Sequence, residues 1–287
     1  MWYYPVMSLK GKTLFITGSS RGIGHSIALK AAKDGANIAI IAKTVEPHPK
    51  LPGTIHTAAQ DMIDAGGNAI AIQTDLRYEE QIEAAIEQTV KTFGGIDICV
   101  NNASSLYIGP TIKTPTKRFD LMNQINARGT YLTSKHCFKY LKKSKNPHLL
   151  MISPPLSMDP KWFKPCLGWA MAKIGMSMCV LGLAEEFKKN KIAVNALWPR
   201  SAIATAAVKN VVGGSLMIQA SRHPDIMGDA AYEVLTKKSK DYTGHFLLDE
   251  DVLRQAGVTD FTNYAVNPKK KLQLDFFVDE GDNIFPN

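Results

Sequence analysis

The sequence contains few cysteines, no apolar run long enough to cross a membrane and no internal repeat. Its 4 cysteines lack metal-ligand spacing and two of them lie in apolar segments, so we expect reduced core thiols and no metal site. Residues 1–7 have neither the basic region nor the apolar stretch of a signal peptide, and the end, Phe285-Pro286-Asn287, is not a peroxisomal address. The longest apolar run, 174–184, is too short for a membrane span. We therefore expect a cytoplasmic protein.

Positive charge exceeds negative charge, but the lysines stand in short, separate groups along the chain. The formal net charge is +8, and several lysine groups follow helix-like segments, where cations suit the negative end of the helix dipole. No basic stripe interleaved with aromatic residues occurs, so we expect no nucleic-acid partner. A general attraction for anionic ligands fits the charge.

Short apolar runs alternate with longer segments of helical periodicity along the chain. The expected strands are 14–17, 37–42, 69–74, 96–100, 149–152, 192–196 and 246–248. This alternation predicts an α/β fold, a single doubly wound domain with a mostly parallel seven-stranded sheet and helices on both faces. We expect residues 1–8 to be an N-terminal extension and residues 9–287 to be the domain, because no linker or low-complexity tract divides them.

The most informative stretch is Thr17-Gly18-Ser19-Ser20-Arg21-Gly22-Ile23-Gly24, which follows an apolar run and opens onto a segment of helical periodicity. A strand, a glycine turn and a helix in this order place backbone N–H groups and the positive end of a helix beneath a pyrophosphate. Glycines tolerate unusual backbone angles and permit the close approach of a ligand. Residues 18–24 are therefore predicted to bind a dinucleotide. The alternative is a bare turn before a helix.

Further motifs follow in order: Asp75, Asn101-Asn102-Ala103, Asn126, Lys173 and Asn195-Ala196-Leu197-Trp198-Pro199. Through this ordered set, from about residue 9 to residue 249, the chain resembles the short-chain dehydrogenase/reductase family. It is similar in particular to a hydroxysteroid dehydrogenase-like group, through residues 33–37, 47–50, 114–118 and 153–155. The resemblance implies a Rossmann-type domain that uses a nicotinamide cofactor on a carbonyl or secondary alcohol of lipid- or steroid-like shape. Some members of the group carry a carboxy-terminal sterol-carrier domain, which we do not expect in a chain of this length.

The end of the second strand bears on the choice of cofactor. An acidic residue there would bind both ribose hydroxyls and repel a 2′-phosphate, but this chain reads Ile41-Ala42-Lys43-Thr44. Lys43 and Arg21, whose fork of donors suits phosphate oxygens, therefore favour NADP(H) over NAD(H). Lys43 could instead be a solvated lysine at the end of a strand.

Three more positions take roles from the resemblance. Asp75 is implied to contact the adenine, although it could instead be the N-cap of the following helix. Asn102 belongs to a stretch that supports the strand ends beside the cofactor. Asn126 is implied to hold a water in a proton relay, or it is a buried amide that bends its helix.

The catalytic segment departs from the family pattern. In the family, a tyrosine four residues before a lysine gives or takes the proton, while the lysine lowers the phenol pKa and binds the nicotinamide ribose. This chain keeps Lys173 but has Trp169 at the tyrosine position, and an indole N–H does not titrate in the useful range. The carbonyl-polarising serine is also altered, because the expected serine pair reads Ser153-Pro154. Ser153 and Ser157 are the candidates for that role.

Two functions follow from these residues. The chain is an NADP(H)-dependent oxidoreductase acting on a small apolar carbonyl or alcohol, or it is an NADP(H)-binding pseudoenzyme with a sensing or assembly role. In the first case Lys173 could itself supply the proton if burial lowered its pKa, and Tyr107 is a weaker candidate. Trp162 and Phe163 could form an apolar substrate wall or anchor their own loop. The resemblance also implies a homo-oligomer, with the apolar helix at 169–187 as a candidate interface.

Overall fold

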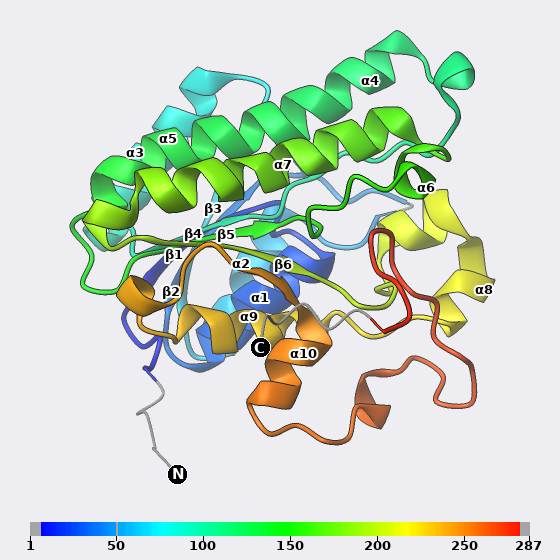
Figure 1. The fold of residues 1–287 in the computed structure, drawn as a ribbon. Helices are drawn as coiled ribbons and strands as arrows, with labels where there is room; N and C mark the ends of the chain where they lie inside the picture. Colours follow the sequence, from blue (N-terminus) through cyan, green and yellow to red (C-terminus); the bar gives the residue numbers. More distant parts are fainter. Residues whose placement is uncertain (1–6, 50, 282–287) are drawn as a thin grey trace.

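The computed structural model describes residues 7–49 and 51–281. Within them, parallel strands form one 7-stranded sheet in the order β3-β2-β1-β4-β5-β6-β7 (Figure 1). The doubly wound sheet expected from the sequence is confirmed, and every strand pair in it is parallel. The strands are β1 (Thr13–Thr17), β2 (Asn37–Ala42), β3 (Asn68–Gln73), β4 (Ile98–Asn101), β5 (His148–Ile152), β6 (Ala193–Trp198) and β7 (Phe246–Leu248).

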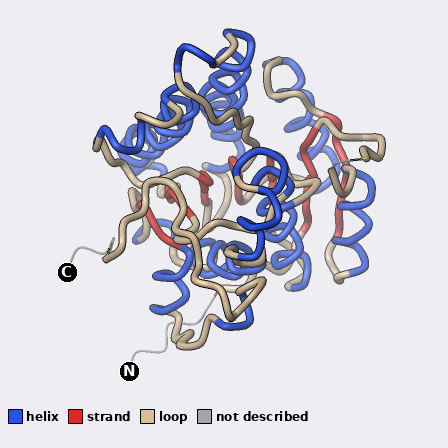
Figure 2. The backbone as a smooth tube through the Cα atoms, turned by 90° about the vertical axis from the view of Figure 1, so that its right-hand side faces the viewer, coloured by secondary structure: helices blue, strands red, loops and turns tan. Residues whose placement is uncertain are grey.

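Helices cover both faces of the sheet, as Figures 1 and 2 show from two sides. One face carries α1, α2, α9 and α10, and the other carries α3, α5 and α7. The helices are α1 (Gly22–Lys33), α2 (Ile55–Asp64), α3 (Glu79–Phe93), α4 (Thr116–Met122), α5 (Gly129–Leu141), α6 (Pro160–Phe163), α7 (Leu167–Glu186), α8 (Gly214–Gln219), α9 (Asp225–Leu235) and α10 (Asp249–Gln255). Two π-helical turns, η2 (Asn123–Arg128) and η4 (Val208–Val212), and four short 3-10 turns, η1 (Thr111–Lys113), η3 (Lys188–Asn190), η5 (Ser239–Asp241) and η6 (Thr262–Tyr264), complete the described elements.

Local sequence signals explain where several of these elements begin and end. Helix α3 ends at Gly94, whose φ of +85° is the left-handed conformation that favours glycine at a helix end. Helix α2 begins with a capping box, in which the hydroxyl of Thr54 accepts from the N–H of Thr57 and the Thr57 hydroxyl accepts from the N–H of Thr54. Strands β2 and β7 have the expected bounds, and the other strands differ from expectation by one or two residues at one or both ends.

The two faces of the sheet bury separate apolar clusters, and a third cluster lies beyond the strand ends. The third cluster joins the start of α7 and Trp198 to residues 274–278 near the carboxyl end of the chain. Helix α7 is the one described helix that is long and apolar enough to cross a membrane by length and composition, and 61% of its most apolar window is buried inside the protein. Its apolar character extends beyond the run at 174–184 because the helix packs against the sheet and against its neighbours.

The lysine groups that are separate in the sequence are gathered by the topology. Strands β5, β6 and β7 are neighbours and run parallel, so the segments that precede them share one edge of the sheet. The lysines there are Lys142, Lys143, Lys145, Lys188, Lys189, Lys191, Lys237, Lys238 and Lys240. This edge is at the amino ends of the strands, away from the carboxyl ends where a nucleotide is expected.

The expected N-terminal extension is described only in part. Residues 1–6 of it, and the terminal residues 282–287, lie outside the described residues. The hydroxyl of Ser8 donates to the carboxylate of Asp34, and Leu9 is buried. The last residues of the extension therefore pack against the domain at the end of α1.

Candidate active site at the carboxyl edge of the sheet

A cavity of about 860 Å³ opens at the carboxyl ends of the strands. Its lining runs from the glycine turn past the ends of β2 and β3 to the start of α7 and to residues 273–276, and apolar side chains predominate away from the glycine turn. Most of the predicted site residues line it together: Gly18, Ser20, Arg21, Gly22, Ile23, Lys43, Asp75, Asn102, Trp169 and Lys173. Four others are buried or lie behind the lining: Ser19, Gly24, Asn126 and Ser153.

The glycine turn is required by the protein's own packing as well as by a ligand. Gly18 and Gly22 have φ angles of +66° and +60°, which L side chains rarely adopt. A Cβ at Gly18 would lie 2.7 Å from the Cα of Ala103, and a Cβ at Gly24 would collide with the side-chain amide of Asn102. The first N–H groups of α1, which begins at Gly22, have no acceptor within the helix. The turn therefore fits a pyrophosphate, and its glycines also let β1 and β4 approach each other.

Two of the predicted cofactor residues hold the turn in place from behind. The side-chain amide of Asn102 donates to the carbonyl oxygens of Thr17 (2.9 Å) and Gly18 (3.0 Å). The buried hydroxyl of Ser19 donates to the backbone of β1 at 2.7 Å and accepts from the N–H of Ile41 at 3.1 Å. Their side chains therefore position the turn, and Asn102 also lines the cavity.

Arg21 and Lys43 occupy the same end of the cavity with different surroundings. The guanidinium of Arg21 donates to the carbonyl oxygens of Pro52 (2.7 Å) and Gly53 (3.0 Å), so it ties the proline-containing loop after β2 to the glycine turn. Lys43 is exposed at the end of β2 and lines the cavity beside that loop. Two nitrogen atoms of the Arg21 guanidinium, which we expected to bind a phosphate, therefore donate to the backbone of this loop instead.

Asp75 lies at the cavity beyond the end of β3, in a tight ion pair. The guanidinium of Arg77 approaches its carboxylate to 2.6 Å, and the Arg77 N–H donates to the same carboxylate at 3.1 Å. These bonds to Arg77, with a further contribution from Lys43, hold the pKa of Asp75 below its ordinary value. The alternative role as helix N-cap is wrong, because α3 has Tyr78 as its N-cap without any side-chain capping bond.

Lys173 is buried on α7 and faces the other end of the cavity. Its ammonium donates to the carbonyl oxygen of Ile152 at 2.7 Å and lies 5.0 Å from the centre of the Trp198 ring. Burial lowers the pKa of Lys173 to about 7, against the opposing effect of the Asp275 carboxylate. A lysine in this state exchanges its proton near neutral pH.

Trp169 lies one helical turn before Lys173 and forms part of the cavity wall. Its ring packs at 5.3 Å against the ring of Phe276. Its indole N–H is fully buried, and no acceptor for it occurs among the described residues. The tryptophan therefore fills the place of the family tyrosine without presenting a polar hydrogen to the cavity.

The two serine candidates lie outside the cavity lining. The hydroxyl of Ser153 is buried and has no partner in the described part of the chain. The hydroxyl of Ser157 accepts from the N–H of Asp159 at 3.4 Å in the loop before α6. A carbonyl-polarising role for either serine stays a prediction.

Asn126 clamps the loop that follows β4. Its side-chain oxygen accepts from the N–H of Ser105 at 2.7 Å, and its amide donates to the Ser105 carbonyl oxygen at 3.1 Å. It is fully buried in the π-helical turn η2 between α4 and α5. Tyr107, in the loop that Asn126 holds, donates to the carbonyl oxygen of Lys113 and is not a lining residue.

Sequence reasoning missed the segment from Gln273 to Phe276, which lines the cavity beside α7. The indole N–H of Trp198 donates to the carbonyl oxygen of Phe276 at 2.8 Å, and Leu274 forms a β-bridge with Ser201. The rings of α6, including Trp162, pack on the adjacent Phe277 and anchor the segment. The only signal in the sequence is an apolar and aromatic group of residues after a lysine-rich stretch.

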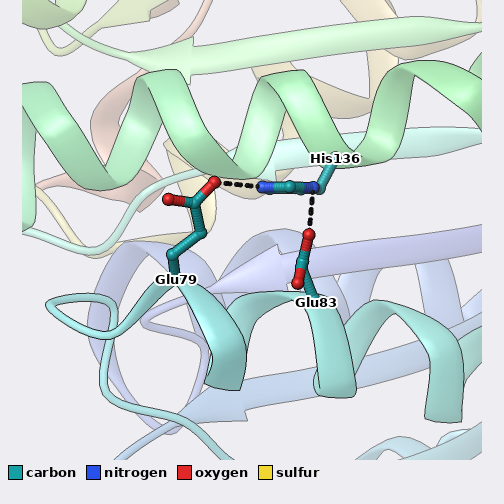
Figure 3. Close-up of side chains that lie close together, drawn as sticks. All are labelled: Glu79, Glu83 and His136. Atoms are coloured by element: carbon teal, nitrogen blue, oxygen red, sulfur yellow. Dashed lines mark hydrogen bonds and ion pairs between the residues drawn. The ribbon is translucent and has the colours of Figure 1, made fainter.

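A group of possible metal ligands lies elsewhere, between α3 and α5 (Figure 3). The two ring nitrogens of His136 lie 2.7 Å from a carboxylate oxygen of Glu79 and 3.1 Å from one of Glu83. Lys135 approaches the Glu79 carboxylate to 3.0 Å, and Arg128 lies within 4.0 Å of it. Lys135 and Arg128 already pair with the Glu79 carboxylate, so we interpret the group as a polar clamp between two helices.

Comparison with known proteins identifies the family. Residues 12–213 match the family model of short chain dehydrogenases. This chain belongs to the short-chain dehydrogenase family. Hydroxysteroid dehydrogenase-like protein 2 from Bos taurus is 58% identical to it over 272 residues, which cover 95% of this chain and 64% of the relative. The chain thus spans just under two thirds of the length of this curated relative.

Solved structures agree with the assignment to the short-chain dehydrogenases. A short chain dehydrogenase from Mycobacterium thermoresistibile is 52% identical with a TM-score of 0.90, and the match covers 95% of this chain and 96% of that one. A Xanthomonas campestris protein is 51% identical with a TM-score of 0.93, over 96% of this chain and 100% of that one. At fold level only, a metagenomic short-chain oxidoreductase solved with NADP (24% identical, TM-score 0.69) and a Mycobacterium avium carveol dehydrogenase solved with NAD (21%, 0.72) are also similar.

For a short-chain dehydrogenase, this chain keeps the residues predicted at the cofactor end and departs from the family pattern at the tyrosine position. The glycine turn, Lys43 and Asp75 surround one part of the cavity, and Lys173 is present at the other. The tyrosine position holds Trp169.

Proposed function

We propose that this chain is an NADP(H)-dependent oxidoreductase for apolar carbonyl compounds or secondary alcohols, and that Trp169 slows proton transfer while leaving cofactor binding intact. The observation that carries the proposal is the single cavity that joins the glycine turn and Lys43 at one end to Lys173 and an apolar lining at the other. A dinucleotide bound on the turn and an apolar substrate beside Lys173 would share that space.

The residues present fit the dinucleotide. The N–H groups at the start of α1 suit a pyrophosphate, and Asp75 lies where the adenine end would be. Lys43 at the end of β2, where no acid stands, favours a ribose that carries a 2′-phosphate. When bound, the cofactor supplies or accepts hydride at the substrate carbon. Lys173 would hold the nicotinamide ribose and exchange a proton close to neutral pH.

The lining supports an apolar substrate. Leu106, Ile108, Val208, Val212 and Met217 all line the cavity away from the glycine turn. Burying a side chain or ligand of similar size against such residues stabilises by about 25 cal/mol per Å² of apolar surface. A lipid- or steroid-like carbonyl compound fits this lining better than a polar sugar.

A binding experiment and a turnover experiment test the proposal. NADPH and NADH are titrated by their fluorescence, and a panel of apolar ketones, aldehydes and secondary alcohols is followed at the nicotinamide absorbance band. We expect tighter binding of NADPH than of NADH, slow turnover of apolar substrates, and faster turnover by Trp169→Tyr. Equal affinity for both cofactors would refute the NADP(H) preference.

A second candidate function is a pseudoenzyme that binds NADP(H) and acts by sensing or assembly. The buried, unpaired indole N–H of Trp169 favours it, because this side chain cannot give a proton to a bound substrate. NADPH binding without turnover on the whole panel, together with turnover by Trp169→Tyr, would decide for this function.

We also propose that the chain forms a homo-oligomer. Helix α7 leaves large apolar side chains exposed, with Met178 at 62% and Leu181 at 59% exposure, and Met171 on the same helix is also exposed. Light scattering on the purified protein measures the molar mass. Replacing Met178 and Leu181 by glutamate is expected to give monomers.

A further inference from the structure

A carboxyl group lies in the cavity where the family pattern has no acid. Asp275 lines the cavity together with Trp169 and Lys173, although it stands about a hundred residues later in the sequence. It is partly buried, and its charge interacts with that of Lys173. The family motif contains no residue from this part of the chain.

The backbone around Asp275 is held firmly on both sides. The Asp275 N–H donates to the carbonyl oxygen of Arg200 at 3.1 Å, and the next N–H, that of Phe276, donates to the Asp275 carboxylate at 2.7 Å. The Phe276 carbonyl oxygen is bound by Trp198, over whose ring the Lys173 ammonium lies. The carboxyl group is therefore fixed relative to Lys173 by protein contacts, with one oxygen committed to a backbone N–H.

The surroundings favour an acid that is still protonated near neutral pH. Burial raises the pKa of Asp275 to about 7, against the opposing effects of the hydrogen bond from the Phe276 N–H and of the Lys173 charge, and the carboxylate of Asp249 adds to the rise. A carboxylic acid with a pKa near the working pH can give a proton in one step and recover it afterwards. Trp169 cannot do either.

We propose that Asp275 is the proton donor and acceptor that replaces the missing tyrosine. The inference rests on the proposed oxidoreductase function. In reduction, the carbonyl carbon gains a hydride, and its oxygen takes up the carbon–oxygen π pair. That oxygen then bonds to the Asp275 proton as the carboxyl O–H bond breaks. The products are the alcohol, the oxidised cofactor and the Asp275 carboxylate, which takes a proton from water. Oxidation of an alcohol runs the same step in reverse.

Other charged groups near Asp275 bear on its pH dependence. The charges of Lys173, on α7, and of Asp249, at the start of α10, both act on Asp275. Arg200 accepts the Asp275 N–H through its carbonyl oxygen, and its guanidinium pairs with Asp251 at 2.7 Å. The charge of Arg222 acts on Asp249. Since protonated Asp275 is the form that reduces, reduction is expected to slow as the pH rises above about 7.

The test is a double-mutant cycle of Asp275→Asn with Trp169→Tyr. In the natural chain, Asp275→Asn is expected to lower kcat for reduction roughly 100-fold or more, the usual loss for a positioned acid. In the Trp169→Tyr protein the restored phenol supplies the proton. Asp275→Asn is therefore expected to lower kcat less than roughly tenfold there, well below the loss in the natural chain. A structural role for Asp275 would predict equal losses in both proteins. Equal losses would therefore overturn the proposal.

Two readouts besides turnover accompany the cycle. The NADPH affinity of Asp275→Asn, measured by fluorescence, is expected to stay within about threefold of that of the natural chain. This change is well under the tenfold that corresponds to about 1.4 kcal/mol. Isotope-edited NMR of Lys173 is expected to show a lower pKa in this variant, because the Asp275 carboxylate raises it in the natural chain. Asp279→Asn is the matched control, an exposed carboxylate in the same segment that pairs with Lys161 at 2.6 Å. It should leave kcat unchanged.

The outcomes separate this inference from the function on which it rests. Full turnover by Asp275→Asn in the natural chain overturns the role of Asp275 and leaves the oxidoreductase function standing. An inert natural chain beside an active Trp169→Tyr protein also overturns it, since Asp275 is present and does not suffice. Loss of NADPH binding by the natural chain would instead remove the proposed function itself.

Discussion

Replacing Lys173 by methionine is expected to change how the stability of this protein depends on pH. Burial lowers the pKa of Lys173 from 10.5 to about 7. Each pKa unit corresponds to about 1.4 kcal/mol, so holding this ammonium charged inside the protein costs about 5 kcal/mol. Methionine has a similar length and no charge, and it removes that cost.

The sign follows from the protons bound by the folded and unfolded chains. Below pH 7 the lysine is charged in both, so the full cost is present. Between pH 7 and 10.5 the unfolded chain binds a proton that the folded chain lacks, so stability of the natural protein rises by about 1.4 kcal/mol per pH unit. Lys173→Met lacks this rise. Loss of the bond to Ile152 adds a roughly constant offset of about 1 kcal/mol.

Urea unfolding of both proteins between pH 6 and pH 9 measures the effect. The stability advantage of Lys173→Met is expected to shrink by about 3 kcal/mol over that range, most of it above pH 7. Loss of Lys173 also raises the pKa of Asp275, since it removes an opposing charge, and this change acts in the same direction. Lys164→Met, at an exposed position, is the control and should give a constant difference. Parallel curves for Lys173→Met and the natural protein would refute a buried, neutral-pH lysine.

Three further predictions follow from contacts at the cofactor end and at the start of α2. Gly24→Ala should destabilise the protein by about 1–3 kcal/mol in urea unfolding, because the added Cβ collides with the side-chain amide of Asn102. By contrast, the Cβ added in Gly182→Ala meets open space on α7, so this variant should be neutral or stabilising. Lys43→Asp should weaken NADPH binding roughly 10- to 100-fold, the loss expected for a charged hydrogen bond, and should weaken NADH binding little. Equal weakening of both cofactors would contradict a role of Lys43 in binding the 2′-phosphate. Thr54→Ala should cost about 1 kcal/mol by breaking the capping box of α2, measured by the same unfolding assay.

The strands and the cofactor end could be predicted because their signals are local. Short apolar runs predict the strands β2 and β7, and glycines end helices such as α3. In a parallel sheet, residues that follow neighbouring strands meet at one edge. Lys43 is therefore predicted beside the glycine turn from its position after β2, and Asp75 from the family resemblance, and both line the cavity.

The role of individual side chains at the same site could not be predicted. Arg21 has the residue type that binds phosphate, but its guanidinium is used by the carbonyl oxygens of the loop at Pro52 and Gly53. Asp75 has the residue type of an N-cap, but it pairs with Arg77 instead. Each outcome depends on which backbone groups lie within about 3 Å, the range of a hydrogen bond, and that is set by packing.

By itself the sequence determined the parallel α/β architecture, the dinucleotide turn at Gly18–Gly24 and the replacement of the catalytic tyrosine by Trp169. Periodicity and motif spacing are carried by consecutive residues, so they can be read without the fold. Only the tertiary structure brought Asp275 into the cavity with Lys173 and gathered three lysine groups at the opposite edge of the sheet. These groups are far apart in the chain, and their proximity comes from long-range packing around Trp198 and from the strand order. Burial in that packed site also moves the pKa values of Lys173 and Asp275 to about 7.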